Sequence, residues 1–187
     1  MNSIRLSKRA TTLALASAFS VGAVVASNAA YAGSTPANLA VSASVTANCT
    51  ISTSAVAFGA YDPVVANAAS ALNGNGSVTV ACTKGSAPSI TLDLGANAAS
   101  TQRNMKVTGG GSDILAYELY QPPSTTPNTA CTFPGSQVWG TAGGAIFTPT
   151  APASKAGRTY NVCGTVAAGQ DVAVGSYQDT VVATVNF

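Results

Sequence analysis

Apolar and polar residues alternate along most of the chain with a period of two. The alternating segments are rich in valine, isoleucine, threonine and aromatic residues, and glycine, proline, serine and asparagine separate them. This pattern is typical of β-strands joined by turns. We expect about eight strands and no helix. The predicted strands cover residues 56–59, 77–82, 89–94, 105–107, 114–120, 145–147, 159–166 and 177–187.

Leucines such as Leu92, Leu94, Leu115 and Leu119 would also suit helices, but their β-branched neighbours and the short spacing between turns favour strands. Many short antiparallel strands with turn-rich connections predict an all-β fold, a β-sandwich. Surface loops are expected at 66–75, 109–112 and 121–128, which offer few apolar groups to bury. None of them marks a domain boundary.

The two ends of this alternating region have complementary features. Between residues 35 and 45 the apolar residues Ala37, Leu39, Val41, Ala43 and Val45 fall on one face, opposite small or polar ones. At the other end, the strand predicted at 177–187 continues to the last residue without a polar tail. A chain that stops inside a core strand is expected to be incomplete alone. The C-terminal end suggests a fold that lacks a strand, and the N-terminal segment suggests a strand that fills such a gap.

The first 32 residues have the features of a secretory signal peptide. Arg5, Lys8 and Arg9 precede an apolar run over about 10–26, and residues 30–32 form an A-x-A cleavage site. Polar residues dilute the run, which makes it a poor membrane span. We expect an exported protein that begins at Gly33.

The remaining 155 residues suit one domain with a sizeable core. The predicted signal contains three of the eight basic residues, so five basic and six acidic residues remain. No basic patch indicates nucleic acid or an anionic membrane. Eleven charges in 155 residues lie well below the roughly 25% usual for soluble domains. A surface this weakly charged suits a protein that packs against copies of itself.

All four cysteines follow the predicted cleavage site, and an even number in an exported chain favours disulfides. Three pairings are possible, and sequence alone does not choose between them. We favour Cys49–Cys82 with Cys131–Cys163, which closes two loops of similar length. A metal site is disfavoured because the chain has no C-x-x-C pair and no histidine.

An enzyme is difficult to build from these residues. Histidine, the commonest general base, is absent. The carboxylates are scattered singly near turns or strand ends, where hydrogen bonding within a turn explains them. The triple glycine at 109–111 lacks the lysine and helix of a phosphate-binding loop. We therefore expect no catalytic residues, no metal and no cofactor.

Seven short sequence motifs resemble, in order, those of spore coat protein U-like domains, and they extend over nearly the whole mature chain. They are Cys49-Thr50-Ile51, Phe58-Gly59-Ala60-Tyr61-Asp62, Val80-Ala81-Cys82-Thr83-Lys84-Gly85, Arg103-Asn104-Met105, Leu115-Ala116-Tyr117-Glu118-Leu119-Tyr120, Val138-Trp139-Gly140 and Gly175-Ser176-Tyr177-Gln178-Asp179. The chain is similar to the major rod pilin of archaic, Csu-type, chaperone–usher pili, which promote attachment and biofilm formation. The cysteines at 131 and 163 have no counterpart in this pattern.

The resemblance implies an incomplete immunoglobulin-like β-sandwich (47–187), completed in the pilus by the N-terminal donor strand (33–46) of the next subunit. The donor residues would be Ala37, Leu39, Val41, Ala43 and Val45. The pairing is a β-augmentation, in which the donated backbone pairs with a sheet edge and alternate side chains enter the core.

The acceptor groove would be lined by residues on one face of the last strand, with Phe58 contributing from the first. The strand residues are Val181, Ala183, Val185 and Phe187. The family also implies a periplasmic chaperone that covers the groove before assembly and an outer-membrane usher that exchanges it for a donor strand. The terminal carboxylate of Phe187 would then contact the chaperone.

Two alternatives remain open. The chain could be a self-complete secreted module that binds carbohydrate or is adhesive, with a stacking surface formed by Trp139, Tyr117, Tyr120 and Tyr160. Widely spaced aromatic residues in strands, however, belong more often to the core. A coat protein with the same domain would polymerise without a chaperone. A disordered leader at 33–46 would not require the strict alternation found there.

Overall fold

The computed structural model describes residues 32–187. The predicted signal peptide, apart from Ala32, lies outside the described residues. The chain divides after Ser42 into two units, and the fold described here is that of the second, residues 43–187. Within residues 32–187, no helix has the length and apolar character needed to cross a membrane.

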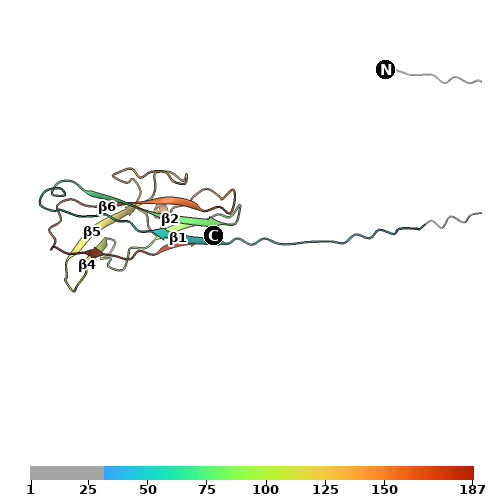
Figure 1. Cartoon of the computed structure of the whole chain (residues 1–187), viewed down its shortest axis with the longest axis horizontal. Coiled ribbons are helices and arrows are strands. Elements are labelled where there is room, and N and C mark those ends of the chain that lie inside the picture. Colours follow the sequence, from blue (N-terminus) through green and yellow to red (C-terminus); the bar gives the residue numbers. More distant parts are fainter. Residues whose placement is uncertain (1–31) are drawn as a thin grey trace, which may run out of the picture. The chain divides into compact units, whose positions relative to one another are not determined.

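Eight strands form two antiparallel sheets, and the described part of the chain contains no α-helix (Figure 1). The larger sheet has the order β1-β2-β6-β5-β4-β7, and the smaller one pairs β3 with β8. The strands are β1 (Cys49–Ser54), β2 (Leu72–Cys82), β3 (Ser89–Leu92), β4 (Arg103–Val107), β5 (Ile114–Tyr120), β6 (Arg158–Val166), β7 (Tyr177–Gln178) and β8 (Ala183–Asn186), with a 3-10 turn η1 (Gly143–Ala145). The prediction of an all-β, immunoglobulin-like sandwich is confirmed.

Alternate residues of the central strands form the core. In β5, Leu115, Tyr117 and Leu119 are buried while their neighbours are partly exposed. The aromatic rings of Trp139, Phe147 and Tyr160 pack with centroids 5.1 and 5.0 Å apart in succession. The period of two seen in the sequence therefore reflects burial of one face of each strand.

Two predicted strand positions were wrong. The first strand is Cys49–Ser54, and residues 56–59 form no strand, because the backbone leaves β2 after Ser54. Residues 145–147 are not a strand either. Gly143–Ala145 form the 3-10 turn, and Phe147 makes an isolated bridge to Ile90. The segment 145–147 is apolar because the Phe147 ring is buried, not because the segment belongs to a sheet.

The strand predicted at 177–187 is interrupted. Its first part, β7, pairs with β4, and its last part, β8, pairs with β3 in the other sheet. Between them the Asp179 carboxylate binds the backbone N–H and side-chain amide of Asn97. This last segment thus crosses from one sheet to the other.

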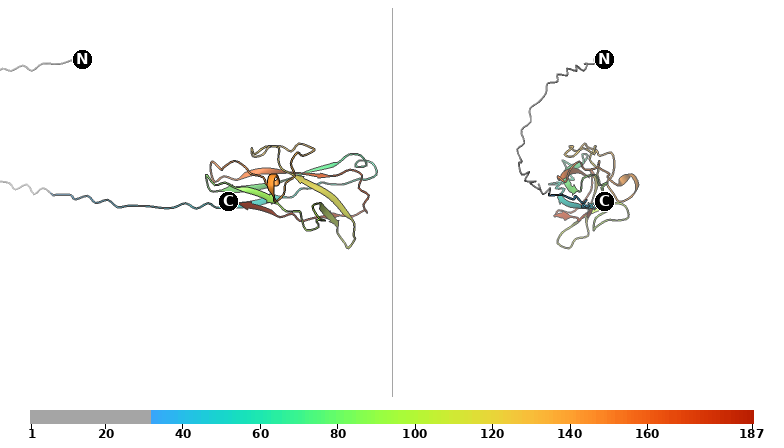
Figure 2. Two further views of the ribbon diagram at one scale, coloured as in Figure 1. Left: turned by 180° about the vertical axis from the view of Figure 1, so that it is seen from behind. Right: turned by 90° about the vertical axis from the view of Figure 1, so that its right-hand side faces the viewer.

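The domain has two ends, which we call the base and the far pole. At the base β1 and β6 begin and β2 and β8 end; Figures 1 and 2 mark the C-terminal end of β8 there. The far pole consists of the loops at 62–71, 108–113 and 167–176. Because β2 has eleven residues, the strand spans about 33 Å between the poles.

Candidate functional site

A long groove opens between the segment that follows β1 and the last segment of the chain. It consists of two adjoining cavities of about 400 and 700 Å³. Both are lined by Val56, Phe58, Met105 and Tyr177, so they form one continuous depression. The smaller cavity extends to Leu92 and Ala183, and the larger extends to the far pole.

The walls of the groove include two strand edges that lack a partner within residues 32–187. β1 pairs on one side with β2, and β8 pairs on one side with β3. Thr53 and Ser54 at the end of β1 and Ala183 at the start of β8 line the smaller cavity. Unpaired backbone N–H and C=O groups on such edges are a template for another strand.

Glycines make room for the segment that carries Val56 and Phe58. A Cβ atom on Gly164 would lie 2.7 Å from both side chains, and one on Gly74 would lie 2.9 Å from the Phe58 ring. Any larger residue at Gly164 would force Phe58 to shift. The glycines of β2 and β6 therefore allow Phe58 to lie close over the sheet, where its ring meets Tyr117 edge-on at 6.0 Å.

One polar network lies beside the apolar residues of the groove. The Tyr117 hydroxyl donates a hydrogen bond to Asp179 Oδ2 at 2.6 Å. Burial, followed by this bond to a carboxylate, raises the pKa of Tyr117, which stays neutral. Asp179 also accepts hydrogen bonds from Asn97. These bonds fix the position of residues 177–183 along the groove.

The environment of the fully buried Arg103 indicates a structural role. Its guanidinium forms an ion pair with Glu118 and donates to the carbonyl oxygens of Asp93 and Trp139. These partners satisfy a charge that would be costly to bury alone. The arrangement joins β4 to β5 and to the loop that contains Trp139.

The predicted acceptor residues fall in different places. Phe58 lines both cavities, and Val181 and Ala183 line the smaller one. Val185 packs against the core without lining either cavity. Phe187 is 55% exposed at the base.

Sequence reasoning missed several groove residues. They are Tyr61, Leu72, Met105, Leu115, Val172 and Tyr177. One signal could have found Tyr177, because it shares the odd-numbered face of the last segment with Val181 and Ala183. The others become neighbours only through the pairing of strands that are distant in sequence.

The predicted donor residues are strongly exposed. Leu39 and Val41 are each 87% exposed and Val45 is 84% exposed. Residues 32–48 contain no charged side chain and form no strand in this structure. Three large apolar side chains on one face of an extended segment therefore have no apolar cover in this state.

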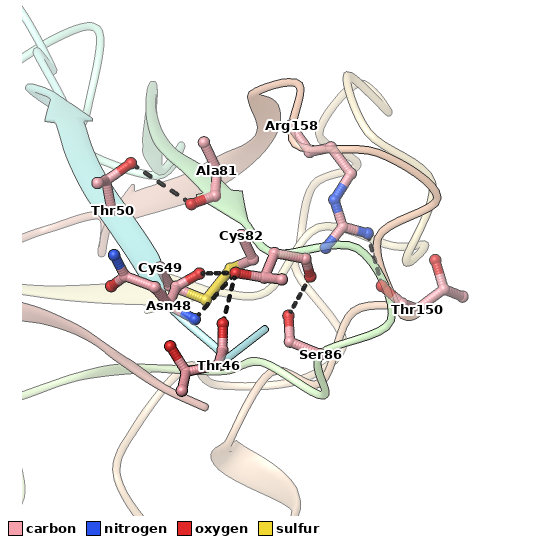
Figure 3. Close-up of a disulfide and its surroundings, with 10 residues drawn as sticks. Thr46, Asn48, Cys49, Thr50, Ala81, Cys82, Ser86, Thr150 and Arg158 are labelled. Atoms are coloured by element: carbon pink, nitrogen blue, oxygen red, sulfur yellow. Dashed lines mark hydrogen bonds between the residues drawn. A yellow bond between two sulfur atoms is a disulfide. The ribbon is translucent and has the colours of Figure 1, made fainter. Parts of the chain in front are cut away.

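Figure 3 shows Thr46 and Asn48 beside the Cys49–Cys82 disulfide at the base, where Thr83 holds both residues. The Thr83 hydroxyl accepts a hydrogen bond from Asn48 N at 3.1 Å, and its proton faces Thr46 O and Asn48 O, each at 3.3 Å. Thr83 N donates to Asn48 O at 2.8 Å. The bonds extend the β1–β2 ladder by one step beyond the Cys49–Cys82 disulfide. Residues 46–48 thus continue the line of β1.

The structure contains the disulfides Cys49–Cys82 and Cys131–Cys163, the pairing that the sequence analysis favoured. The first joins β1 to β2 at the base. The second ties the loop after β5 to Cys163 in the middle of β6.

The aromatic residues considered for a carbohydrate site do not form an exposed platform. Trp139, Tyr117 and Tyr160 are at most 5% exposed, and only Tyr120 is partly accessible. In residues 32–187, no group of three or more histidine, cysteine, aspartate or glutamate side chains could hold a metal ion. The groove remains as a feature that is open to a ligand.

Comparisons with known proteins agree with this architecture. The Spore Coat Protein U domain family matches residues 35–184. Protein U of Myxococcus xanthus is 35% identical over 144 residues, which are 70% of this chain and 70% of that protein.

Among solved structures, the chain is similar to the chaperone–tip adhesion subunit pre-assembly complex CsuC–CsuE from archaic chaperone–usher Csu pili of Acinetobacter baumannii. The TM-score is 0.51 at 22% identity, covering 76% of this chain and 40% of the other. The minor tip subunit HdaB of the E. coli Hda pilus matches with a TM-score of 0.35 at 13% identity, covering 74% of this chain and 79% of the other. The first similarity shows a shared fold.

Proposed function

The chain belongs to the Spore Coat Protein U domain family, and we propose that it is a structural pilin that polymerises by donor-strand complementation. In this proposal the segment 33–46 of one copy fills the groove of another. The observation that carries the proposal is the groove with Val56, Phe58 and Met105 in its lining, beside strand edges that are unpaired within residues 32–187, together with an exposed segment of matching alternation.

The donor supplies what the groove lacks. Backbone groups of an added strand would pair with the free edge of β1 or β8, and its apolar face would cover Phe58, Met105 and Tyr177. Each leucine or valine that becomes buried contributes on the order of 1.5–3 kcal/mol. With Leu39, Val41 and Val45 on the buried face, the junction between two copies would be long-lived.

The groove is proposed to accept another copy's segment rather than its own. Thr83 holds residues 46–48 at the base, where they continue β1. To enter its own groove, the segment before Thr46 would have to reverse direction immediately before this residue. A donor from a second copy needs no such turn.

An open fibre also determines the direction of the donor. The donor strand is joined to its own domain at that domain's base. A linear chain of subunits therefore grows only if this joined end of the donor leaves the acceptor's groove at the acceptor's far pole. This requires the donor to run antiparallel to β8, which runs from far pole to base. In the opposite direction, three subunits would have to meet at one base. The contact is heterologous and non-closing, as a fibre requires.

An open groove is a hazard before assembly, because exposed apolar edges aggregate. We propose that a periplasmic chaperone covers the groove and that an outer-membrane usher exchanges it for a donor strand. The similar CsuC–CsuE structure is itself a complex of a chaperone with a pilus subunit. The protein would accordingly be exported through the periplasm to a cell-surface pilus.

The same reasoning supports a rod subunit with a part in attachment and biofilm formation. The strands described for residues 43–187 form a single sandwich, as expected for a rod subunit. The family's description favours a second candidate, a coat subunit that assembles through the same groove without a chaperone. Dependence of the soluble subunit on a co-expressed chaperone separates the two.

The proposal is tested with the chain exported from cells that co-express the candidate chaperone. Unboiled gel electrophoresis should show a ladder of oligomers for the mature chain. Deletion of residues 33–46 should remove the ladder and leave a chaperone-bound monomer. Stable chaperone-free monomers from both forms would refute the proposal and favour the self-complete module.

Point substitutions provide a matched control for the deletion. Val41 faces the groove in the proposed donor, whereas Ser42 faces away. We expect Val41→Asp to abolish the ladder, because it would bury an unpaired carboxylate. Ser42→Asp introduces the same charge and should leave the ladder intact. Equal effects of the two would contradict the assigned face.

A further inference from the structure

Positive side chains collect at the base of the domain. Lys84 lies in the turn after β2, Lys155 in the loop before β6, and Arg158 at the start of β6. Gly85 N donates to Pro152 O at 3.0 Å, which holds the two lysine-bearing loops side by side. Both lysines are exposed, and no acidic side chain lies in these loops. The terminal carboxylate of Phe187 at the base offsets one of these three positive charges.

Negative side chains collect at the far pole. Asp62, Asp113 and Asp171 lie in three loops that contact one another. Gly169 N donates to Asn67 O at 2.8 Å, and Ala173 N donates to Asp113 Oδ2 at 2.7 Å. Across residues 32–187 the single ion pair is that of Arg103 with Glu118, so these three carboxylates and the basal lysines have no salt-bridge partner there.

Exposed valines lie among these carboxylates. Val64 and Val65 are 80% and 77% exposed in the turn that Asp62 stabilises, and Val174 is fully exposed beside Ala173. Pro63 and Val174 also line the larger cavity, so this apolar surface continues the groove. An apolar surface with an acidic rim is typical of a protein contact.

We infer that the far pole is a docking surface for the base of the next copy of this chain, with Lys84 and Lys155 facing Asp62, Asp113 and Asp171. The inference rests on the proposed function, because antiparallel insertion places the base of one subunit against the far pole of its neighbour. The three valines would be covered in the same contact.

Charge complementarity gives the contact two properties that the donor segment lacks, namely long-range attraction and a preference between poles. The donor segment has no charged side chain, so it provides neither long-range attraction nor a preference between poles. The poles are about 33 Å apart, and charges are screened beyond about 8 Å at physiological salt, so each pole acts by itself. Opposite poles attract and like poles repel, which favours head-to-tail encounters.

Lys106 provides an internal control. It is exposed near the end of β4, where it pairs with Ile114 and Gln178 at the far pole. It therefore weakens the acidic character of that pole. Lys106→Glu and Lys84→Glu change the net charge equally but act on opposite poles.

The experiment measures the rate at which the full mature chain assembles after dissociation in guanidinium and dilution. At about 20 mM salt we expect assembly about tenfold faster than at about 300 mM, because steering is screened. At low salt Lys84→Glu should slow assembly several-fold and Lys106→Glu should accelerate it. Equal slowing by both substitutions, or no dependence on salt, would overturn the inference.

A second measurement separates this inference from the proposed function. A blocked, uncharged peptide of residues 33–46 is added to the full chain carrying Val41→Asp, whose own donor is inactive. The peptide should bind at a rate that neither salt nor Lys84→Glu changes, because the peptide lacks the domain and therefore its positively charged base. Failure to bind would refute the proposed function. Binding by the peptide together with salt-independent assembly of the full chain would refute only the docking of the poles.

Discussion

The Tyr117 hydroxyl donates a 2.6 Å hydrogen bond to the Asp179 carboxylate, linking the middle of β5 to the segment between β7 and β8. The two residues are 62 positions apart in the sequence. Their bond holds the last segment where it crosses from one sheet to the other. The shape of the groove therefore depends on a polar contact within it.

Replacing Tyr117 by phenylalanine should destabilise the domain by about 1–2 kcal/mol, because a hydrogen bond to a charged acceptor is lost. Asp179 keeps its bonds from Asn97, which limits the loss. Urea denaturation measures the change in the free energy of unfolding. Tyr120→Phe is the control and should change it by less than about 0.5 kcal/mol. Equal effects of the two would show that the Tyr117 bond contributes nothing.

A side chain at Gly164 should displace the groove wall. Gly164→Ala places a methyl group 2.7 Å from the Phe58 ring and Val56, and such overpacking costs about 1–3 kcal/mol. The cost should shrink when Phe58→Ala is added, since part of the obstruction is then gone. Gly144→Ala, where the nearest atom is 4.0 Å away, is the neutral control. Strict additivity of the Gly164 and Phe58 substitutions would contradict this contact.

Thr83→Val should release the chain before β1. Valine has nearly the same shape as threonine but neither accepts from Asn48 N nor donates to Thr46 O. The Asn48 amide should exchange with solvent about tenfold faster, which corresponds to a loss of about 1.4 kcal/mol of local protection. Exchange of the Val80 amide in the middle of β2 should change much less. An unchanged Asn48 rate would show that Thr83 does not fix this segment.

The turn after Asp62 should be sensitive to acid. Hydrogen bonds from the N–H groups of Val64 and Val65 lower the pKa of Asp62 below its ordinary value of 3.8. The stabilisation is therefore fully present above pH 3.8 and is lost as the pH falls through the lower folded pKa. Amide exchange at Val64, corrected for intrinsic rates, should accelerate in that range. Asp62→Asn should remove this pH dependence; an Asp62 titration midpoint above 3.8 would contradict the account.

The sequence predicted the strand content well because burial of one strand face imposes a period of two. Residues 114–120 coincide with β5, and 159–166 differ from β6 only by Arg158 at its start. It failed at residues 56–59, where Phe58 is apolar because it covers glycines and the groove, not because it lies in a ladder. Local pattern does not distinguish these two causes of burial.

The groove was harder to predict than the strands. The alternation of the last segment indicated Val181 and Ala183, but not the interruption at Asp179, which depends on Asn97 and Tyr117. The charged poles had no signal at all in the sequence. Lys84 and Lys155 become neighbours only because β2 and β6 pair antiparallel and bring their loops together.

The central claim is that residues 33–46 complete the groove, and moving this segment tests it most directly. In a rearranged chain the segment is removed from the N-terminus and attached after Phe187 through about four residues. A linker this short, at about 3.3 Å per residue, reaches only a donor that starts at the base and runs antiparallel to β8. We predict a monomer that forms no ladder and unfolds at a higher temperature than the chain lacking residues 33–46. A rearranged chain that still polymerises, or that gains no stability over the deletion, would contradict the claim.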